Sequence, residues 1–395
     1  MKFVVAPDSF KGSISAIEAA SAMEDGIKRV FADSEVTKVP LADGGEGTVE
    51  ALVTATAGKI IYVTVRDPLS RETKSFFGVL GNGKTAIIEM AAASGLLLLK
   101  PEERNPYITT TYGTGQLIKA ALDYGCDEII IGIGGSATND GGAGMIQALG
   151  ASMLDSDGRE LFFGGKALKD LHTINLDNMD PRLGATKITV ACDVDNPLCG
   201  ERGASAIYGP QKGASPEMVK ELDAALANFA SKVKDQLGID VSNVPGAGAA
   251  GGLGAGILAF LNARLKPGIE LVLDAVDFEN KIKNADLVLT GEGRIDEQTA
   301  YGKAPMGVAQ VAQKYGVSVL AFGGILGDSY EKVYEKGIDF VSANVQSIIS
   351  LDEAMENGYA LLASNTERAM RAVKIGMNIR AINNEQLTMD SKKGF

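Results

Sequence analysis

The chain has 395 residues, more than one ordinary hydrophobic core requires and enough for two domains of about 150–200 residues each. Hydrophobic residues make up 45% of the sequence and charged residues 22%, a balance typical of a folded globular protein. The net charge is −12 and no run of five basic residues occurs, which argues against an extended surface for binding nucleic acid.

The first sixty residues alternate between strand-like and helix-like segments, as in a parallel sheet. An apolar strand is predicted over residues 2–6 and is followed by a loop over 7–12. Ser15 and Glu18 then form a capping box that predicts the start of a helix. A second strand, over 35–41, leads into the glycine-rich segment 43–47 and another helix.

Residues 60–90 predict antiparallel hairpins instead. The segment from Ile60 to Val65 is rich in β-branched residues, and Asp67-Pro68 and Asn82-Gly83 are turn signals. A mixed region of helices and strands continues to about residue 280. Its apolar segments predict strands over 128–133, 187–191 and 269–273.

After Asn280 the parallel alternation returns, with strands predicted over 285–289, 318–322 and 340–345. We therefore expect an α/β protein of two domains. Both chain ends, 1–60 and 280–377, would form a Rossmann-like parallel three-layer domain, and 61–279 an inserted mixed α+β domain. Residues 378–395 are polar without clear periodicity, which predicts a frayed or loosely packed tail.

The segment from Gly78 to Thr85 matches the Walker A expression letter for letter. A P-loop must join a strand to the N-terminus of a helix, whereas this segment has strand-like residues on both sides. Asn82-Gly83 is also the dipeptide most typical of a type I′ hairpin turn. We therefore predict a hairpin here and not a phosphate-binding loop.

Glycine-rich loops follow five predicted strands, and ligands of open α/β sheets bind beyond the carboxyl ends of the strands. The first loop holds Asp8, Ser9 and Lys11, and the lysine could neutralise a phosphate or a carboxylate. In the second, Asp43 and Glu46 flank glycines and could hold Mg²⁺ or contact substrate hydroxyls. The helix dipole alone would also favour acids at this position.

The third loop, residues 132–144, is the strongest candidate for binding phosphate. Bare amide groups and hydroxyls precede a helix there, which is the arrangement of an anion site. A Rossmann dinucleotide site is rejected, since no ribose-binding acid follows at the expected distance. The candidate residues of this loop are Gly134, Gly135, Ser136, Thr138, Asn139 and Asp140.

The fourth and fifth loops add acids and cations. Asp193 or Asp195 could be a metal ligand or a base, or the segment could simply be an Asx turn before Pro197. The fifth loop brings together Glu292, Arg294, Asp296 and Lys303, a mixture that suits phosphoryl transfer but also a surface ion-pair network. The glycine–alanine segment 245–256 is compatible with close helix packing or with a helix N-terminus that faces a ligand.

Histidine and cysteine usage narrows the chemistry and the compartment. His172 is the only histidine, which argues against a Ser-His-Asp triad or a histidine-ligated metal. Cys126, Cys192 and Cys199 lack C-x-x-C spacing and predict a reducing, cytoplasmic environment. Asp8 interrupts the first apolar run, so no signal peptide is expected. No run of 18 apolar residues predicts a membrane span.

Taken together, these loops resemble the bacterial type I glycerate kinase family. The motifs occur in order over nearly the whole chain: PDSFKGS, PLADGGEGT, IEMAAASGL, GTGQLI, GIGGSATNDGG, CDVDNPL, YGPQKGA and LTGEGRIDEQT. The resemblance implies transfer of phosphate from ATP to glycerate with Mg²⁺, on a two-domain α/β fold unlike that of P-loop kinases. It also implies a role in the breakdown of glycolate, glyoxylate or sugar acids.

On this basis we expect glycerate between the domains, with its carboxylate on Lys11 or Arg294. ATP phosphates would lie on the 134–142 loop, and Asp193 or Asp296 would hold Mg²⁺. One of these acids, or Asp43, would orient the attacking hydroxyl. The other candidates for binding substrate or ATP are Asp8, Ser9, Glu46, Gly134, Gly135, Ser136, Thr138, Asn139, Asp140, Asn196, Lys212 and Glu292.

Similarity to the bacterial group favours 2-phosphoglycerate over 3-phosphoglycerate as the product. A kinase for another small hydroxy acid is the main alternative. A non-catalytic two-domain protein that binds small molecules is the alternative from another class. The sequence leaves a homo-oligomer open.

Overall fold

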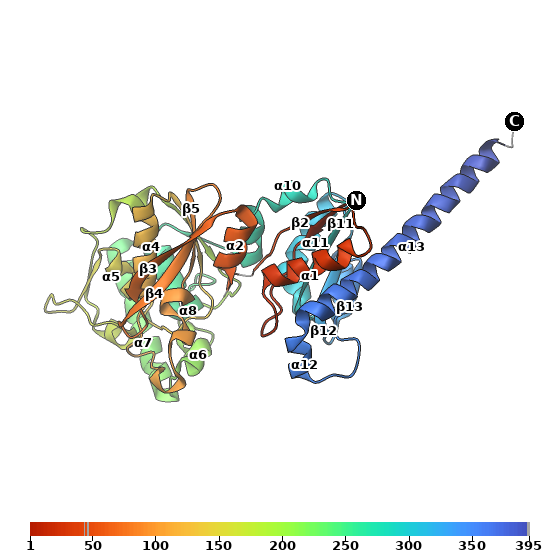
Figure 1. Cartoon of the computed structure of the whole chain (residues 1–395). Helices are drawn as coiled ribbons and strands as arrows, with labels where there is room; N and C mark the ends of the chain where they lie inside the picture. The colour runs from red at the N-terminus through yellow and green to blue at the C-terminus, as the bar shows by residue number, and fades with distance from the viewer. Residues whose placement is uncertain (43, 46, 393–395) are drawn as a thin grey trace. The chain divides into compact units, whose positions relative to one another are not determined.

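The computed structural model describes residues 1–42, 44–45 and 47–392, with side chains up to residue 379 (Figure 1). Cα packing divides the chain into two compact units: unit 1 comprises 1–41 and 273–395, and unit 2 comprises 42–272. The expected α/β class, with parallel sheets and helices, is confirmed. The domain ranges expected from the sequence stay a prediction.

Unit 1 is built on a five-stranded sheet in which every strand pair is parallel. Numbered along the chain, the spatial order of the strands is 2-1-3-4-5. In this doubly wound order ligands bind at the point where the direction of winding reverses, which here lies between the first and third strands. The strands in spatial order are β2 (Glu35–Lys38), β1 (Lys2–Val5), β11 (Leu287–Ile295), β12 (Val319–Leu326) and β13 (Phe340–Ala343).

Two helices from opposite ends of the chain, α1 and α13, pack against each other in unit 1 (Figure 1). The predicted capping box starts α1, with the Ser15 side chain accepting from Glu18 N–H. Met23, Ile27 and Met370 are buried in the core with strand residues such as Phe3 and Phe322. The helices of the unit are α1 (Ala16–Lys28), α10 (Phe278–Ile282), α11 (Ala304–Lys314), α12 (Leu351–Glu356) and α13 (Gly358–Lys392).

The backbone of residues 378–392 is helical and belongs to α13. The frayed or loosely packed tail that the sequence suggests stays a prediction.

Unit 2 contains a six-stranded mixed sheet. Strands β5, β6, β9 and β10 are parallel, whereas β3, β4 and β5 pair antiparallel, as the hairpin signals predict. The parallel strands end together, because Glu89, Gly132, Ala191 and Lys266 pair in one row. In spatial order the strands are β10 (Arg264–Lys266), β9 (Lys187–Ala191), β6 (Glu128–Gly132), β5 (Thr85–Glu89), β4 (Glu72–Val79) and β3 (Lys59–Arg66).

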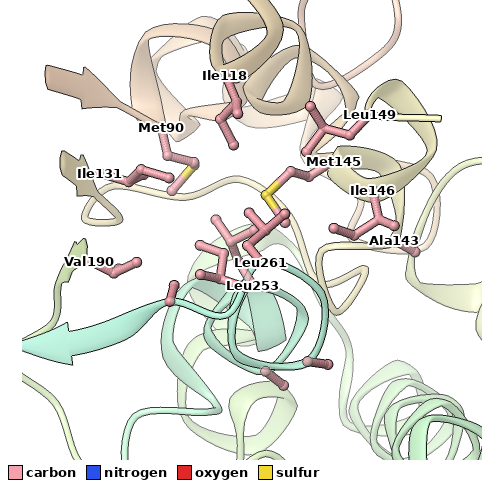
Figure 2. Close-up of a cluster of buried hydrophobic side chains, with 14 of the residues drawn as sticks. Met90, Ile118, Ile131, Ala143, Met145, Ile146, Leu149, Val190, Leu253 and Leu261 are labelled. Carbon is pink, nitrogen blue, oxygen red and sulfur yellow. The ribbon is translucent and has the colours of Figure 1, made fainter. Parts of the chain in front are cut away.

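The core of unit 2 lies between this sheet and its helices. Figure 2 shows Ile131 and Val190 of the sheet facing Met145 of α5 and Leu253 of α8. A small hairpin of β7 (Ser152–Leu154) and β8 (Thr173–Asn175) adds to the unit. The helices are α2 (Thr48–Thr56), α3 (Ala91–Ser94), α4 (Tyr112–Tyr124), α5 (Ala143–Ala148), α6 (Ala204–Tyr208), α7 (Pro216–Leu237), α8 (Ala249–Phe260) and α9 (Gly268–Ala275), the last of which crosses into unit 1.

The strand predicted over 269–273 is wrong, since these residues belong to helix α9. Ile269, Leu271 and Val272 are all buried, and a short apolar run does not distinguish a buried strand from a buried helix. Pro267 stands directly before the helix, where its missing N–H costs nothing.

The glycines of α8 allow close packing against the 132–144 loop. A Cβ on Gly256 would lie 2.4 Å from Gly141 O, and a Cβ on Gly251 would lie 2.0 Å from Thr138 O. Gly251 also has a φ of +72°. Of the two interpretations of segment 245–256, the structure therefore supports close packing.

The Walker A look-alike is a hairpin, as predicted. β4 and β5 pair antiparallel, with Gly78 opposite Ile87. The predicted turn type is wrong. A type I′ turn requires a positive φ at both central residues. Gly83 has a φ of +71°, but the φ of Asn82 is not positive. Instead, Asn82 Oδ1 accepts from the N–H groups of Lys84 and Thr85, as in an Asx turn.

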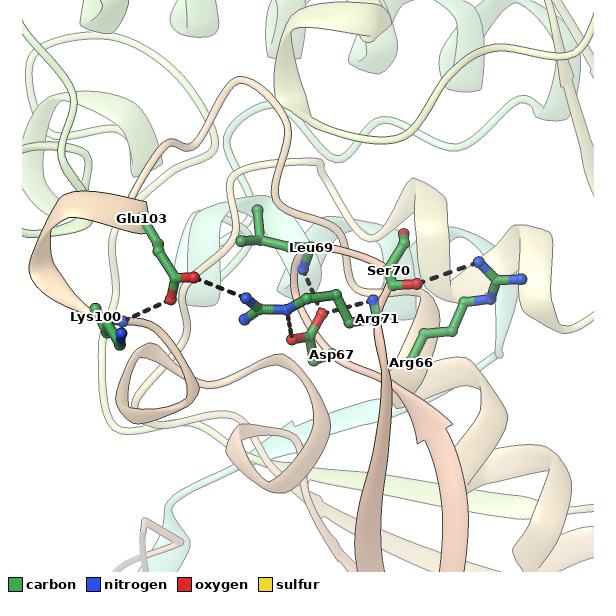
Figure 3. Close-up of polar contacts among 7 residues, drawn as sticks. All are labelled: Arg66, Asp67, Leu69, Ser70, Arg71, Lys100 and Glu103. Atoms are coloured by element: carbon green, nitrogen blue, oxygen red, sulfur yellow. Dashed lines mark hydrogen bonds and ion pairs between the residues drawn. The ribbon is translucent and has the colours of Figure 1, made fainter.

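An ion-pair network fixes the turn between β3 and β4 (Figure 3). Arg71 Nε donates to Asp67 Oδ2 at 2.6 Å and its Nη1 donates to Glu103 Oε1 at 2.7 Å. Asp67 Oδ1 also accepts the N–H groups of Leu69 and Arg71. Pro68 O in this turn accepts the N–H of Thr110. The bond positions Thr110 and Thr111 beside the 132–144 loop, where Thr111 N–H donates to Asp140.

Candidate active site

In unit 1 the first and fifth candidate loops meet at the winding reversal between β1 and β11. Asp8 N–H donates to Gly291 O at 2.9 Å, and Ser9 N–H donates to Asp8 Oδ1 at 2.6 Å. Gly293 lies against the same loop, since a Cβ there would be 3.5 Å from Lys11 N. The structure therefore brings the Asp8–Lys11 segment next to the Glu292–Asp296 segment, at the place where this sheet order binds ligands.

The predicted loop at 290–295 is wrong, because β11 continues to Ile295. Glu292 pairs with Gly323 and Arg294 with Ile325 of β12, which is extended in the same way. Gly324 approaches Gly293 O so closely that a Cβ there would lie 2.5 Å from it. The glycines that suggest a loop in the sequence instead allow two strands to approach each other closely.

Glu292 is a buried carboxylate with two polar neighbours. Its Oε1 accepts Thr299 Oγ1–H at 2.7 Å, and its Oε2 lies 3.5 Å from Lys303 Nζ. Burial raises the pKa of Glu292, while the Thr299 hydrogen bond and the Lys303 charge act in the opposite direction. Lys303 is one of the charges predicted for the fifth loop, whereas Thr299 was not identified from the sequence.

Arg294 and Asp296 form a second pair of opposite charges. Arg294 Nε donates to Asp296 Oδ2 at 2.9 Å, and Asp296 Oδ1 accepts Gln298 N–H at 2.9 Å. Gly327 leaves room for this pair, since a Cβ would lie 2.7 Å from Arg294 Nε. The site in unit 1 thus presents two acids and two cations within one short segment.

In unit 2 the fourth loop begins where β9 ends. Asp193 is exposed, and its Oδ1 accepts Gly268 N–H at 2.9 Å, next to the end of β10. Asn196 Oδ1 accepts Tyr208 Oη–H at 2.6 Å, and Asp195 pairs with Arg202 at 2.9 Å. Asp193 is therefore placed at the carboxyl edge of the sheet, as expected for a ligand-facing acid.

The tip of the third loop is open to solvent. Gly134 and Gly135 are exposed, and Gly135 has a φ of +75°. Neither amide donates to an acceptor among the residues that the structure describes. The backbone of the tip is therefore suited to accept an anion.

Asp140, behind this tip, is fully buried and organises the loop. Its Oδ2 accepts Thr111 N–H at 2.8 Å, Thr111 Oγ1–H at 2.9 Å and Gly144 N–H at 3.3 Å, and its Oδ1 accepts Gly142 N–H at 3.2 Å. Burial raises the pKa of Asp140, and these hydrogen bonds oppose that shift. This carboxylate therefore links helix α5 to the segment before α4.

Lys212 lies beneath the same loop, 1% exposed. Its Nζ donates to Ser136 Oγ at 2.7 Å and to Thr138 O at 2.6 Å. Burial lowers the pKa of Lys212 to about 7, and the charge of Asp140 opposes that shift. The candidates Ser136, Thr138, Asn139, Asp140 and Lys212 thus form one buried cluster under the glycine tip.

Glu89, at the end of β5, was not among the predicted site residues. It is buried, and its Oε1 accepts Val49 N–H at 2.8 Å in the first turn of α2. The motif IEMAAASGL carries this residue, so the resemblance contained the signal. The candidates Asp43 and Glu46, just before α2, lie outside the described residues.

Mg²⁺ would need carboxylate ligands among the candidate acids. Among the residues described, no three His, Cys, Asp or Glu side chains gather as a metal site. Mg²⁺ needs only one or two protein carboxylates beside water and phosphate oxygens. Asp193 lies exposed at a sheet edge of unit 2. In unit 1 each Asp296 oxygen keeps a lone pair beyond the hydrogen bond that it accepts. Each of these acids, taken by itself, therefore fits the ion.

A surface cavity of about 760 Å³ in unit 2 has a different lining. Tyr107, Arg159, Phe162 and Lys166 are among its residues, and none of the described site candidates takes part. The candidate chemistry therefore lies at the strand ends and not in this cavity.

The chain matches the model of the glycerate kinase family over residues 3–374. A glycerate kinase from Haemophilus influenzae is 53% identical over 94% of this chain and 99% of its own length. The Escherichia coli protein named glycerate 2-kinase is 52% identical over 95% and 99%.

The chain belongs to the glycerate kinase family. A crystal structure of a Salmonella typhimurium LT2 protein assigned as a glycerate kinase 2 agrees, with a TM-score of 0.89 and 48% identity over 96% of this chain and 99% of that one. The family predicted from the motifs is thus confirmed. So is the enzyme class, a phosphotransferase with an alcohol acceptor. None of the described helices is long and apolar enough to span a bilayer.

Proposed function

We propose that this glycerate kinase family member transfers the γ-phosphate of ATP to the C2 hydroxyl of D-glycerate, giving 2-phosphoglycerate and ADP. The observation that carries the proposal is the gathering of Asp8, Glu292, Arg294 and Asp296 at the winding reversal of a parallel sheet. The name of the 52% identical Escherichia coli relative supports the C2 position.

The cations of unit 1 would bind the anionic substrate. Lys11 or Arg294 would hold the glycerate carboxylate, because a guanidinium or ammonium forms strong charge-assisted bonds to it. Asp296 keeps the Arg294 guanidinium in place at 2.9 Å. Asp8 and Ser9 would contact the hydroxyls of glycerate from the adjoining loop. Asn196 stays a candidate for binding substrate or ATP.

The amides of Gly134 and Gly135 would bind the phosphates of ATP. Both are exposed and at the end of β6, whereas the side chains of Ser136, Thr138, Asn139 and Asp140 are buried below them. We therefore assign the contact with phosphate to the backbone of the tip, and the support of that backbone to the buried side chains.

In the reaction the C2 oxygen forms a bond to the γ-phosphorus while the bond to the β-phosphate oxygen breaks. The hydroxyl proton passes to a carboxylate, for which Asp193, Asp296 and Asp43 are the candidates. Either Asp193 or Asp296 is also the proposed ligand of Mg²⁺, which when bound would neutralise charge on the phosphates. The protein contributes chiefly position and charge.

We also propose a cytoplasmic enzyme that acts in the breakdown of organic acids such as glyoxylate derivatives. All three cysteines are free thiols, which suits a reducing compartment.

The test is an assay of ADP release by the full chain with ATP, Mg²⁺ and a panel of D-glycerate, L-glycerate, tartronate, threonate and glycolate. We expect the highest kcat/KM with D-glycerate and, by phosphorus NMR, a phosphate on C2. A higher kcat/KM with another acid would make the chain a kinase of that acid. Release of no ADP with any acid would contradict catalysis.

A further inference from the structure

We propose that Lys212 is a positioning residue, whose charged form, opposite Asp140, holds the Gly134–Asp140 loop in the shape that binds phosphate. The inference rests on the proposed function for the role of that loop. It concerns what keeps the loop in place and not a new contact with substrate.

The loop has a reason to need such support. Thr138 Oγ1 and Asn139 Oδ1 are buried and have no hydrogen-bond partner among the described residues. A buried polar atom without a hydrogen-bond partner destabilises the conformation that holds it. The positive φ of Gly135, Gly141 and Gly142 shows a backbone that turns sharply three times within eight residues. Hydrogen bonds elsewhere must hold this conformation.

Lys212 supplies two of those hydrogen bonds at separated points. Its Nζ donates to the side chain of Ser136 and to the backbone oxygen of Thr138. One ammonium group therefore fixes two residues that directly follow the Gly134–Gly135 tip. Asp140 fixes the end of the loop through Thr111, Gly142 and Gly144. The two side chains therefore clamp the loop from both ends.

The charges of the clamp depend on each other. Asp140 is the titratable group whose charge acts on Lys212, and both are buried. Arg104 lies close to Gly213, the residue after Lys212. It approaches Gly213 with its backbone oxygen, which would be 2.3 Å from a Cβ there. A neutral lysine would leave the Asp140 carboxylate without its opposite charge and would hold the loop less firmly.

Lys212 has a pKa of about 7, so the clamp weakens as the pH rises through the neutral range. We expect kcat/KM for ATP to fall on the alkaline side in the wild-type protein. Lys212→Met should lose about 10- to 100-fold in kcat/KM and lose this alkaline limb as well. Ser136→Ala removes one acceptor of the ammonium, so the limb should move to lower pH.

The experiment measures kcat and KM for ATP from pH 6 to 9.5 in these variants and in Lys220→Met, which removes an exposed lysine of α7. Lys220→Met should match the wild type. If Lys212→Met does not fold, Ser136→Ala decides the outcome. An alkaline limb unchanged in Ser136→Ala, or retained in Lys212→Met, would overturn the proposal.

Backbone hydrogen exchange separates this proposal from the proposed function, because it needs no turnover. Exchange of a peptide covering 132–144 should speed up in Lys212→Met, whereas a peptide from β3 should not change. If the wild type phosphorylates no acid but this difference appears, the clamp stands and the kinase assignment fails. Equal exchange in the two proteins would contradict the clamp.

Discussion

The two units hold their candidate residues in different ways. In unit 1 the charges of Glu292, Arg294, Asp296 and Lys303 pair with one another at the ends of two extended strands, and Arg294 is 54% exposed. In unit 2 the charges of Asp140 and Lys212 are buried under a tip of two exposed glycines. Both sets of residues lie at a sheet edge. Unit 1 presents side chains there, whereas the third loop of unit 2 presents backbone and Asp193 is an exposed acid at the end of the neighbouring strand β9.

This difference indicates a division of labour. Exposed side chains can exchange a protein partner for a ligand at little cost, since surface ion pairs contribute about 0–1 kcal/mol. Buried charges cannot do so without a large loss, so they serve to fix a shape. Substitution of the exposed Arg294 in unit 1 should therefore act on chemistry, and substitutions in the buried cluster of unit 2 on stability and on loop geometry.

The largest effect is expected from the acids. Asp296→Asn should lower kcat by about 10²–10⁴-fold, because it removes a charge beside Arg294 while keeping the size of the side chain. Asp193→Asn should do the same in unit 2, where the side chain is exposed. Steady-state kinetics with ATP and D-glycerate measure both.

Asp240→Asn is a suitable control, because among the described residues this exposed acid contacts only Lys234 of α7 and Ser242. It should leave kcat within twofold. Near wild-type kcat in both Asp193→Asn and Asp296→Asn would show that the site is misplaced.

The next largest effect is a loss of stability in unit 2. A Cβ on Gly144 would lie 2.0 Å from Thr110 Oγ1 and 3.0 Å from Asp140 Oδ2. Gly144→Ala should lower the free energy of unfolding by about 1–3 kcal/mol, since these buried groups must move apart. Gly184→Ala, where a Cβ meets nothing within 4 Å, should change it little. Equal midpoints of urea unfolding would contradict the packing around Asp140.

The sequence predicted the capping box of α1 and the hairpin at Asn82, because each depends on residues close together in the chain. It predicted the parallel sheets through the alternation of strand-like and helix-like segments. It failed where a short pattern has two physical solutions. The apolar run 269–273 forms a helix, and the glycines around Gly291 extend a strand. Neither outcome is decided without the neighbouring strand or helix.

The site was predictable only in part for the same reason. Motifs identify residues such as Asp140 and Lys212, but they do not reveal that both are buried, because burial depends on α5, α7 and α8 packing around them. Thr111 contributes two hydrogen bonds to Asp140 from 29 residues away, and no spacing rule indicates it. The motifs identify these residues, but their burial and their hydrogen bonds depend on the tertiary packing.

A smaller effect should appear in the pH dependence of stability. The pKa of Lys212 is lowered from 10.5 to about 7 in the folded protein. Between these values the unfolded chain binds more protons, so this group makes the free energy of unfolding rise as the pH increases. Lys212→Met lacks this contribution. The Tm of Lys212→Met minus that of the wild type should therefore be highest below pH 7 and should decrease toward pH 10.

Calorimetry of the two proteins at several pH values measures this difference. Lys220→Met, with its exposed lysine, serves as the reference and should follow the wild type throughout. A Tm difference that stays constant from pH 6 to 10 would show that Lys212 is not a buried titrating group.

The smallest effect is expected at the Walker A look-alike. Lys84 is 72% exposed in the hairpin loop and lies 4.0 Å from Asp127. In a P-loop the lysine contacts the β- and γ-phosphates, and its loss removes much of the activity. Here Lys84→Met should leave kcat and KM for ATP within twofold, because the segment joins two antiparallel strands and leads to no helix. Lys11→Met, a candidate cation of unit 1, is the matched comparison and should impair the reaction. A large loss in Lys84→Met alone would move the phosphate site from the strand-end loops to this hairpin.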